Sequence, residues 1–265
     1  MAVIGEIYTY IDQIAPFELQ MDFDNAGFLV GREDTAVHRL LVSLDITQSV
    51  VEEAVNKECQ LIVSHHPIIF HPVKSVTNRT VTGCILMSLI ENKIGAICAH
   101  TNLDAVQGGV SDCLAKSLGL SQITLLHQEG KDSRGKPFGI GRVGMVHRRD
   151  LSVQDYAHYV KCCLGAESVR CTDGGKPVQK VAVGGGACGS MLQAAADIGC
   201  DTFVTADVKY DQFLEAKALG VSLLDAGHYA TENVVCPILA QALQEKFTDI
   251  EVVLSANHRE IYVGI

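Results

Sequence analysis

Basic residues are scarce in this sequence, and long apolar runs are absent from it. The 265 residues include 21 Lys and Arg against 31 Asp and Glu, a formal net charge of −10. General nucleic-acid binding needs a basic surface, so this balance argues against nucleic acid as a partner. No apolar stretch approaches the roughly 20 residues of a membrane-spanning helix, which argues against a membrane partner. Residues 1–13 lack the basic start of a secretory signal, so we expect a cytoplasmic protein.

Several signature motifs are also missing. The ten cysteines contain no C-x-x-C pair, and the adjacent Cys162 and Cys163 are badly placed to bridge each other. Apolar or helical contexts surround five others, namely Cys59, Cys84, Cys98, Cys200 and Cys236. We therefore predict reduced thiols, as is usual in the cytoplasm. No glycine-rich loop ends in G-K-[ST], and no G-x-S-x-G nucleophile motif occurs.

Short apolar runs alternate with helical spacing in both halves of the chain, which predicts an α/β fold. Strands are expected at residues 39–44, 61–64, 94–99, 138–146, 178–183, 202–205, 221–224, 251–254 and 261–263. Helices are expected at residues 3–14, 47–57, 82–92, 110–118, 152–163, 209–219 and 231–246, with a glycine loop and helix over 184–198. The repeated order predicts two related, duplicated βαβαβ-like subdomains with a metal site in the cleft between them. The first would hold residues 1–128 and 235–265, the second residues 129–234, with no inserted domain.

Two adjacent histidines end one predicted strand. The run Leu61–Ser64 is apolar enough for a buried parallel strand, and His65 and His66 follow it. Pro67 cannot donate a ladder hydrogen bond and keeps His66 in extended backbone. Open α/β sheets bind their ligands at the carboxyl ends of strands. One core and one surface histidine would also fit this pattern.

Further polar side chains follow other predicted strands. Asp104 comes after residues 94–99, and His228 and Glu232 come after residues 221–224, four apart on one helix face. Imidazole and carboxylate groups suit Zn, Mn, Fe, Co or Ni. The set of five, His65, His66, Asp104, His228 and Glu232, exceeds the needs of one four-coordinate ion with an open position. It suits two divalent ions per subunit bridged by a carboxylate, about 3.5–4 Å apart.

Roles within this set are expected as follows. Glu232 would bridge the ions, with His65 and Asp104 on one and His66 and His228 on the other. His100 is the candidate catalytic residue, although a capping role in its loop fits equally well. The remaining histidines, His38, His71, His127, His147, His158 and His258, are interpreted as structural or surface residues, with His71 also a possible substrate contact. Asp22 and Asp24 are interpreted as turn residues.

A glycine motif offers a competing interpretation. Residues 184–189 fit G-x-G-x-x-G after a predicted strand, and Asp207 follows the next strand. This is the pattern of a dinucleotide-binding loop. It occurs late in the chain and leaves the histidine and carboxylate set unexplained. A tight turn beside the cleft, offering backbone N–H groups to an anion, is the alternative.

These motifs resemble those of the Nif-three-like family, whose members are often named GTP cyclohydrolase 1 type 2 homologs. The matching segments are Asp24-Asn25-Ala26-Gly27, Ser64-His65-His66-Pro67 with Ile68-Ile69-Phe70, His100-Thr101-Asn102-Leu103-Asp104, and Asp225-Ala226-Gly227-His228-Tyr229-Ala230-Thr231-Glu232. The resemblance implies a dinuclear metal centre with the same five ligands. It also implies a homohexamer, a trimer of dimers or two stacked trimers, with the metals facing an internal cavity. Phe23 replaces a tryptophan common in the family, and Asp211 stands where a histidine is frequent.

Two classes of function remain open from the sequence. The first is a metal-dependent hydrolase acting on a small, nucleotide-like substrate, by opening the purine ring of GTP or by cleaving a phosphoester. The second is a non-catalytic metal-binding ring protein that acts as a regulator, chaperone or scaffold. A dinucleotide-dependent oxidoreductase built on the residue 184–189 loop is a third reading.

Overall fold

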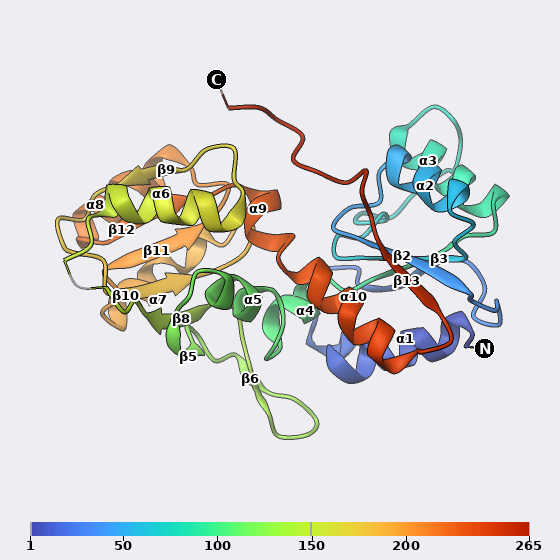
Figure 1. The fold of residues 1–265 in the computed structure, drawn as a ribbon, viewed down its shortest axis with the longest axis horizontal. Helices are drawn as coiled ribbons and strands as arrows, with labels where there is room; N and C mark the ends of the chain where they lie inside the picture. The colour runs from blue at the N-terminus through green and yellow to red at the C-terminus, as the bar shows by residue number, and fades with distance from the viewer. Residues whose placement is uncertain (1, 149, 265) are drawn as a thin grey trace. The chain divides into compact units, whose positions relative to one another are not determined.

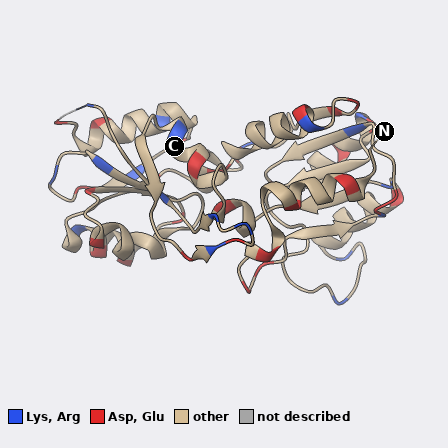
Figure 2. Ribbon diagram, turned by 90° about the horizontal axis from the view of Figure 1, so that it is seen from below, with Lys and Arg blue, Asp and Glu red and all other residues tan. Residues whose placement is uncertain are grey.

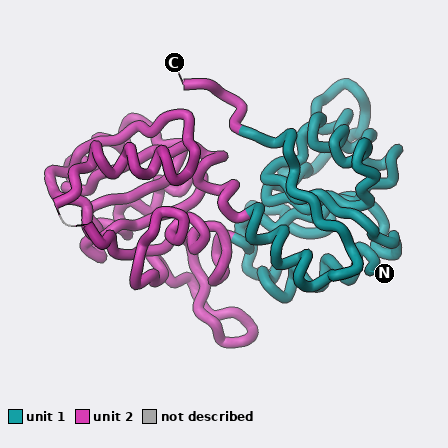
Figure 3. The backbone as a smooth tube through the Cα atoms, in the orientation of Figure 1, with its two compact units in different colours: residues 1–103, 236–259 teal, residues 104–235, 260–265 magenta. Residues whose placement is uncertain are grey.

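The computed structural model describes residues 2–148 and 150–264 of the chain (Figure 1). The chain divides into two compact units, which Figure 3 colours separately. Unit 1 comprises residues 1–103 and 236–259, and unit 2 comprises residues 104–235 and 260–265. Both units combine helices with a mixed β-sheet, so the predicted α/β class is confirmed.

The sheet of unit 1 has the strand order β1-β4-β3-β2-β13. Its strands are β1 (Gly27–Val30), β2 (Arg39–Ser43), β3 (Leu61–Ser64), β4 (Gly95–Cys98) and β13 (Glu251–Leu254). The pairs β13–β2, β2–β3 and β3–β4 are parallel, and β1 is antiparallel to β4. Ser43 pairs with Ser64, and Ser64 pairs with Cys98, so the carboxyl ends of β2, β3 and β4 lie side by side.

Helices cover both faces of this sheet. They are α1 (Ile4–Ile14), the 3-10 turn η1 (Phe17–Leu19), α2 (Gln48–Asn56), α3 (Val81–Glu91) and α10 (Val235–Lys246). Leu41, Ile62 and Ala96 pack with α2 and α3 in one core cluster. Neighbouring strand residues point to the opposite face because side chains alternate along a strand, and there Figure 1 shows α1 and α10.

The sheet of unit 2 has the strand order β5-β8-β10-β11-β12-β9. Its strands are β5 (Ser121–Leu125), β8 (Arg142–Met145), β9 (Arg170–Thr172), β10 (Lys180–Val183), β11 (Thr202–Thr205) and β12 (Ser222–Asp225). β10, β11 and β12 are parallel to one another, whereas β8 and β9 flank them antiparallel. A small hairpin of β6 (Gly130–Lys131) and β7 (Pro137–Phe138) stands apart from this sheet.

The helices of unit 2 also sandwich their sheet. They are α5 (Val110–Ser117), α6 (Val153–Leu164), η2 (Gly189–Met191), α7 (Leu192–Asp197), α8 (Tyr210–Leu219) and α9 (His228–Glu232), while α4 (Thr101–Ala105) contains the boundary between the units. Val181 and Val183 pack with α5 and α6, and Ala182 packs with α7 and α8 on the other face. Gly220 ends α8 in the left-handed conformation with φ 67°, which glycine adopts readily because it has no Cβ atom.

Several boundaries differ from the prediction. The contacts group residues 104–128 with unit 2, because α5 packs on that unit's sheet and its Asp112 forms a buried salt bridge with Arg142. The single helix expected over 231–246 is two helices, α9 and α10. Residues 261–263 form no strand. The short edge strands β5 and β9 lack a continuous apolar run, which is why the sequence did not predict them.

The distribution of basic residues and the length of the helices can be compared with what the composition predicts. Figure 2 shows Lys and Arg dispersed over helices, strands and loops of both units. Among the residues that the structure describes, no helix combines the length and apolar character needed to cross a bilayer.

Candidate metal centre

Three imidazoles lie together at the carboxyl ends of the strands of the unit 1 sheet. His65 and His66 follow β3, and His100 follows β4, the parallel neighbour of β3. The ring centroids are 5.0 Å apart for His65 and His66, 5.2 Å for His65 and His100, and 5.4 Å for His66 and His100. One ring nitrogen of each residue lies within 4.8 Å of the others, a spacing that suits a shared metal ion. The in-register ends of β3 and β4 bring the three together.

Each of these imidazoles has an oxygen acceptor at Nδ1. The pairs are His65 Nδ1 with Ala99 O at 2.8 Å, His66 Nδ1 with Asp45 Oδ1 at 2.8 Å, and His100 Nδ1 with Asp24 Oδ1 at 2.7 Å. An acceptor at Nδ1 favours the tautomer with its proton there and the lone pair on Nε2. Metal-binding histidines are commonly oriented in this way, by a carboxylate or carbonyl behind the ring.

Asp45 is shared between two histidines. Oδ1 accepts the hydrogen bond from His66, and Oδ2 lies 2.8 Å from Nε2 of His258. Burial works to raise the pKa of Asp45, but the hydrogen bonds from His258 and His66 outweigh it and hold the pKa far below its usual range. The carboxylate therefore stays charged and fixed behind His66. His258 itself is oriented by the chain segment that leads to it.

That segment is anchored on Glu53 of α2. The hydroxyl of Ser255 and the backbone N–H groups of Ala256 and Asn257 all donate to the Glu53 carboxylate, and Lys57 lies 2.8 Å from it. Burial opposes the charge on Glu53, yet these donors lower its pKa to about 2. The end of unit 1 is thereby held so that His258 reaches Asp45.

Asp24 accepts the N–H of Asn25, as expected of a turn residue, and it also binds residues far from the turn. Its side chain is inaccessible to solvent and accepts hydrogen bonds from His100 Nδ1 and from both the N–H and the hydroxyl of Thr101. Burial alone would raise the pKa of Asp24, but these bonds lower it to about 2. The Asp24 carboxylate therefore fixes the orientation of the His100 ring.

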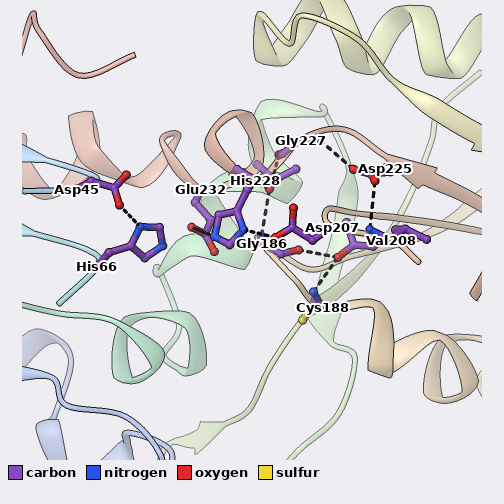
Figure 4. Close-up of polar contacts among 12 residues, drawn as sticks. Asp45, His66, Gly186, Cys188, Asp207, Val208, Asp225, Gly227, His228 and Glu232 are labelled. Atoms are coloured by element: carbon purple, nitrogen blue, oxygen red, sulfur yellow. Dashed lines mark hydrogen bonds and ion pairs between the residues drawn. The ribbon is translucent and has the colours of Figure 1, made fainter. Parts of the chain in front are cut away.

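Unit 2 carries a second set of candidate ligands at the carboxyl end of its sheet. His228 and Glu232 lie on α9 directly after β12, and Asp207 follows β11 (Figure 4). His228 Nδ1 is 2.7 Å from Asp207 Oδ2, and its Nε2 is 2.9 Å from Glu232 Oε2. A ring with a carboxylate oxygen at each nitrogen requires a second proton or a cation on the Glu232 side.

The same region of unit 2 concentrates negative charge. Carboxylate oxygens of Asp104 and Glu232 lie within 4.8 Å of each other, and Glu232 is only 4% exposed. Burial raises the pKa of the nearby Cys188 thiol to about 12, and the charges of Asp104 and Glu232 add to this effect. Two carboxylates this close repel each other unless a proton or a metal ion lies between them.

The glycine loop after β10 presses its backbone against Glu232. A Cβ atom on Gly186 would stand 2.0 Å from Glu232 Oε1 and 3.1 Å from His228 Nε2. Thr231 accepts the Gly186 N–H, while Thr205 and Ala206 donate to the Gly186 carbonyl. The space that a pyrophosphate would need against this glycine is filled by side chains of the chain itself. A Cβ on Gly184 or Gly189 would likewise meet Cys188 or Gln212, so close packing within unit 2 explains the G-x-G-x-x-G pattern.

Comparison with known proteins gives the family. Residues 2–260 match the family described as Duf34/NIF3 (NGG1p interacting factor 3). The chain belongs to this family.

Other Duf34/NIF3-like proteins cover nearly the whole chain. A GTP cyclohydrolase 1 type 2 homolog from Clostridium perfringens is 30% identical over 259 residues, 97% of each chain. Another from Streptomyces coelicolor is 35% identical over 250 residues, 92% of this chain and 87% of its own. Among solved structures, Staphylococcus aureus hypothetical protein SA1388 is 30% identical with a TM-score of 0.92, covering 99% of each chain. A Bacillus cereus protein related to NIF3 has a TM-score of 0.93 at 23% identity, covering 100% of this chain and 99% of its own, which shows a common fold.

In this Duf34/NIF3 chain each predicted site residue lies in one of the two sets. His65, His66 and His100 belong to unit 1, and Asp104, His228 and Glu232 belong to unit 2. The side chains that orient these residues are Asp24, Asp45, Asp207 and His258. Sequence reasoning assigned none of them this role, although it placed Asp207 after a strand. Asp45 could have been found in the same way, since it closely follows β2. His258 follows no strand pattern that points to Asp45.

Proposed function

We propose that this Duf34/NIF3 protein binds two divalent metal ions and uses them to hydrolyse a small, nucleotide-like substrate. The proposed ligands are His65, His66, Asp104, His228 and Glu232. The observation that carries the proposal is the pairing of imidazole Nδ1 atoms with oxygen acceptors, which favours a lone pair on Nε2 in His65 and His66. His228 has a carboxylate oxygen at both ring nitrogens, an arrangement that a cation on the Glu232 side would satisfy. Purely structural histidines have no need of the same tautomer at successive strand ends.

The chemistry of the donor atoms fits a divalent transition metal. Imidazole nitrogen and carboxylate oxygen together suit Zn, Mn, Fe, Co or Ni, whereas Mg and Ca favour oxygen alone. The close carboxylates of Asp104 and Glu232 support a cation, because burial without one leaves two like charges together. Glu232 is the proposed bridge between the two ions.

Bound ions of this kind lower the pKa of a coordinated water and supply hydroxide near neutral pH. Among the protein's own side chains, His100 would carry out the proton transfers. Its Nδ1–H is held by Asp24, so Nε2 presents a lone pair that accepts a proton from water or returns one to a leaving group. The buried Asp24 carboxylate stabilises the resulting imidazolium charge, because its own pKa is lowered to about 2 and it remains ionised.

The names of similar proteins and the chemistry of the proposed ligand residues support the substrate class. Proteins from Helicobacter pylori that are 29% identical over 92% of both chains are named GTP cyclohydrolase 1 type 2. Purine ring opening and phosphoester hydrolysis both need an activated water and a stabilised oxyanion, which the same residues would supply. We include both reactions in the proposal.

The proposal extends to assembly and location. Six copies would form a closed ring, as the family resemblance implies, and native mass spectrometry of purified protein tests this by a hexamer mass. We also propose that the protein works in the reducing cytoplasm, which is consistent with the free, buried thiols of Cys59 and Cys200.

Metal analysis of Glu232→Ala, with Glu215→Ala as a matched control, tests the function. Glu215 is an exposed carboxylate on α8 that is not one of the proposed ligands. We expect Glu232→Ala to lose bound metal and hydrolysis of GTP or phosphoesters while keeping its circular dichroism spectrum, and Glu215→Ala to behave as wild type. Full metal content and activity in Glu232→Ala would contradict the proposal. Tight metal binding by wild type without turnover on any of these substrates would overturn the hydrolase and favour a regulatory or scaffolding role.

A further inference from the structure

A long loop of unit 1 carries exposed apolar side chains next to the histidine cluster. It joins β3 to α3 over residues 65–80 without helix or strand, and it begins with His65 and His66. Loops longer than about 12–15 residues are uncommon in compact domains and usually serve function. Phe70 is 37% exposed and Val73 is 42% exposed in this loop. Exposed apolar side chains that lie together often mark a binding site.

Phe70 forms an aromatic surface with Phe23. The two ring centroids are 6.3 Å apart with an interplanar angle of 58°, and Phe23 is 62% exposed. The Phe70 ring also lies 6.1 Å from the His100 ring and 4.8 Å from the His71 ring. This aromatic surface, Phe23 with Phe70, is therefore continuous with the imidazoles of the candidate metal centre.

Hydrogen bonds fix the aromatic surface to His100. The side chain of Asn25 donates to the carbonyl of Ile69, directly before Phe70, while Asp24 holds His100. Phe23, Asp24 and Asn25 are consecutive, so one short segment sets both the rings and the imidazole. A stacking surface placed by such bonds loses little conformational freedom when a ligand binds.

A cavity adjoins this surface within unit 1. Its volume is ≈ 730 Å³, and its lining includes His66, Phe70, His71 and Lys74, with apolar walls at Ile46, Ile68 and Ile85. Small-molecule sites usually measure about 300–1,000 Å³ and combine apolar walls with a few polar groups. The ammonium group of Lys74 adds a partner for an anionic substituent.

We propose that Phe23 and Phe70 bind the planar heteroaromatic ring of the substrate, one by stacking on its face and the other, inclined by 58°, against its edge. The phosphate of an aromatic nucleotide would be directed toward Lys74. The inference rests on the proposed function and assigns its substrate class. Aromatic side chains stack on any nucleobase, because every base presents a π-face. A ring held against Phe70 lies beside His100, where the proposed proton transfer takes place. Ribose phosphates that lack the base would miss this contact.

The absence of tryptophan from the chain allows a direct optical test. Phe23→Trp keeps an aromatic ring at the surface and introduces the chain's only indole. We expect guanosine 5′-monophosphate to quench its emission on binding and ribose 5-phosphate to leave it unchanged. Equal quenching by guanosine 5′-monophosphate and ribose 5-phosphate, or no quenching by either, would overturn the stacking role. Emission that changes with protein concentration alone would instead assign the surface to contacts between copies of the chain.

Calorimetry on Phe70→Ala separates this inference from the metal centre. We expect its affinity for guanosine 5′-monophosphate to fall about tenfold or more, from the energies typical of base stacking, while its metal content stays at the wild-type level. Phe70→Tyr should restore the affinity, and Tyr210→Ala, which removes an aromatic side chain 78% exposed on α8, should leave it unchanged. Unaltered nucleotide affinity in metal-loaded Phe70→Ala refutes the stacking surface alone. Wild-type protein that binds no metal would refute the proposed function. Titration of guanosine 5′-monophosphate in the presence of a chelator would still measure stacking on Phe70.

Discussion

His228 lies between two carboxylates, with Nδ1 2.7 Å from Asp207 and Nε2 2.9 Å from Glu232. Glu232 is in turn held against the backbone of Gly186, where a Cβ atom would stand 2.0 Å from Oε1. The position of this carboxylate therefore depends on a residue that has no side chain. A methyl group at Gly186 must displace Glu232, and with it one proposed metal bond.

Gly186→Ala should weaken metal binding beyond its cost in stability. Gly165→Ala is the matched control, because Gly165 has φ 62° against 60° for Gly186 and open space around its Cβ position. Left-handed strain should cost each variant about 1 kcal/mol of unfolding free energy. Gly186→Ala should lose more than this, because its Cβ also displaces the buried Glu232 side chain. Only Gly186→Ala should lower the affinity for Mn²⁺ or Zn²⁺ in calorimetric titration, by about tenfold or more. Equal metal affinity in the two variants would contradict this prediction and show that Gly186 does not affect the metal centre.

Asp45→Asn should weaken metal binding through His66. An amide oxygen accepts a hydrogen bond from only one of His66 and His258, and the new NH₂ group faces the other ring. Removing such a partner of a metal-binding histidine typically costs 10–100-fold in affinity, so we expect a loss of at least about tenfold. Competition with a chelator of known affinity measures it. His38→Gln, which changes an exposed histidine, is the control and should match wild type.

Glu53→Gln should reduce stability in a pH-dependent way. The pKa of Glu53 is lowered from 4.5 to about 2, so its contribution is fully present above pH 4.5 and is lost as the pH falls toward about 2. We expect the variant to be less stable by about 2 kcal/mol near neutral pH, with the gap narrowing as the solution is acidified. Urea unfolding at several pH values checks this, and Glu52→Gln, at an exposed neighbour, should show no such trend. A gap that widens on acidification would be inconsistent with the anchoring role.

The sequence predicts the buried strands well, for a simple reason. Leu61–Ser64 and Thr202–Thr205 are exact because an apolar run between breakers marks a buried parallel strand. The edge strand β5 alternates between half-buried and exposed residues and carries no comparable signal. Ligand-type residues were found by their position after strands, since that position is local in sequence.

Long-range partners were beyond the reach of the sequence pattern. The bond between Asp24 and His100 joins residues 76 apart. His258 bonds Asp45 only because Glu53 captures three donors at residues 255–257. The packing of Gly186 against Glu232 likewise changes the meaning of a motif that resembles a nucleotide-binding loop. Each of these contacts depends on the fold being formed first.

Anomalous scattering from crystals soaked in MnCl₂ or ZnCl₂ tests the central claim most directly. The account predicts two peaks about 3.5–4 Å apart, bonded to His65, His66, Asp104, His228 and Glu232. Soaked crystals without a peak at these five side chains, or with their imidazoles turned away from any bound ion, would contradict it.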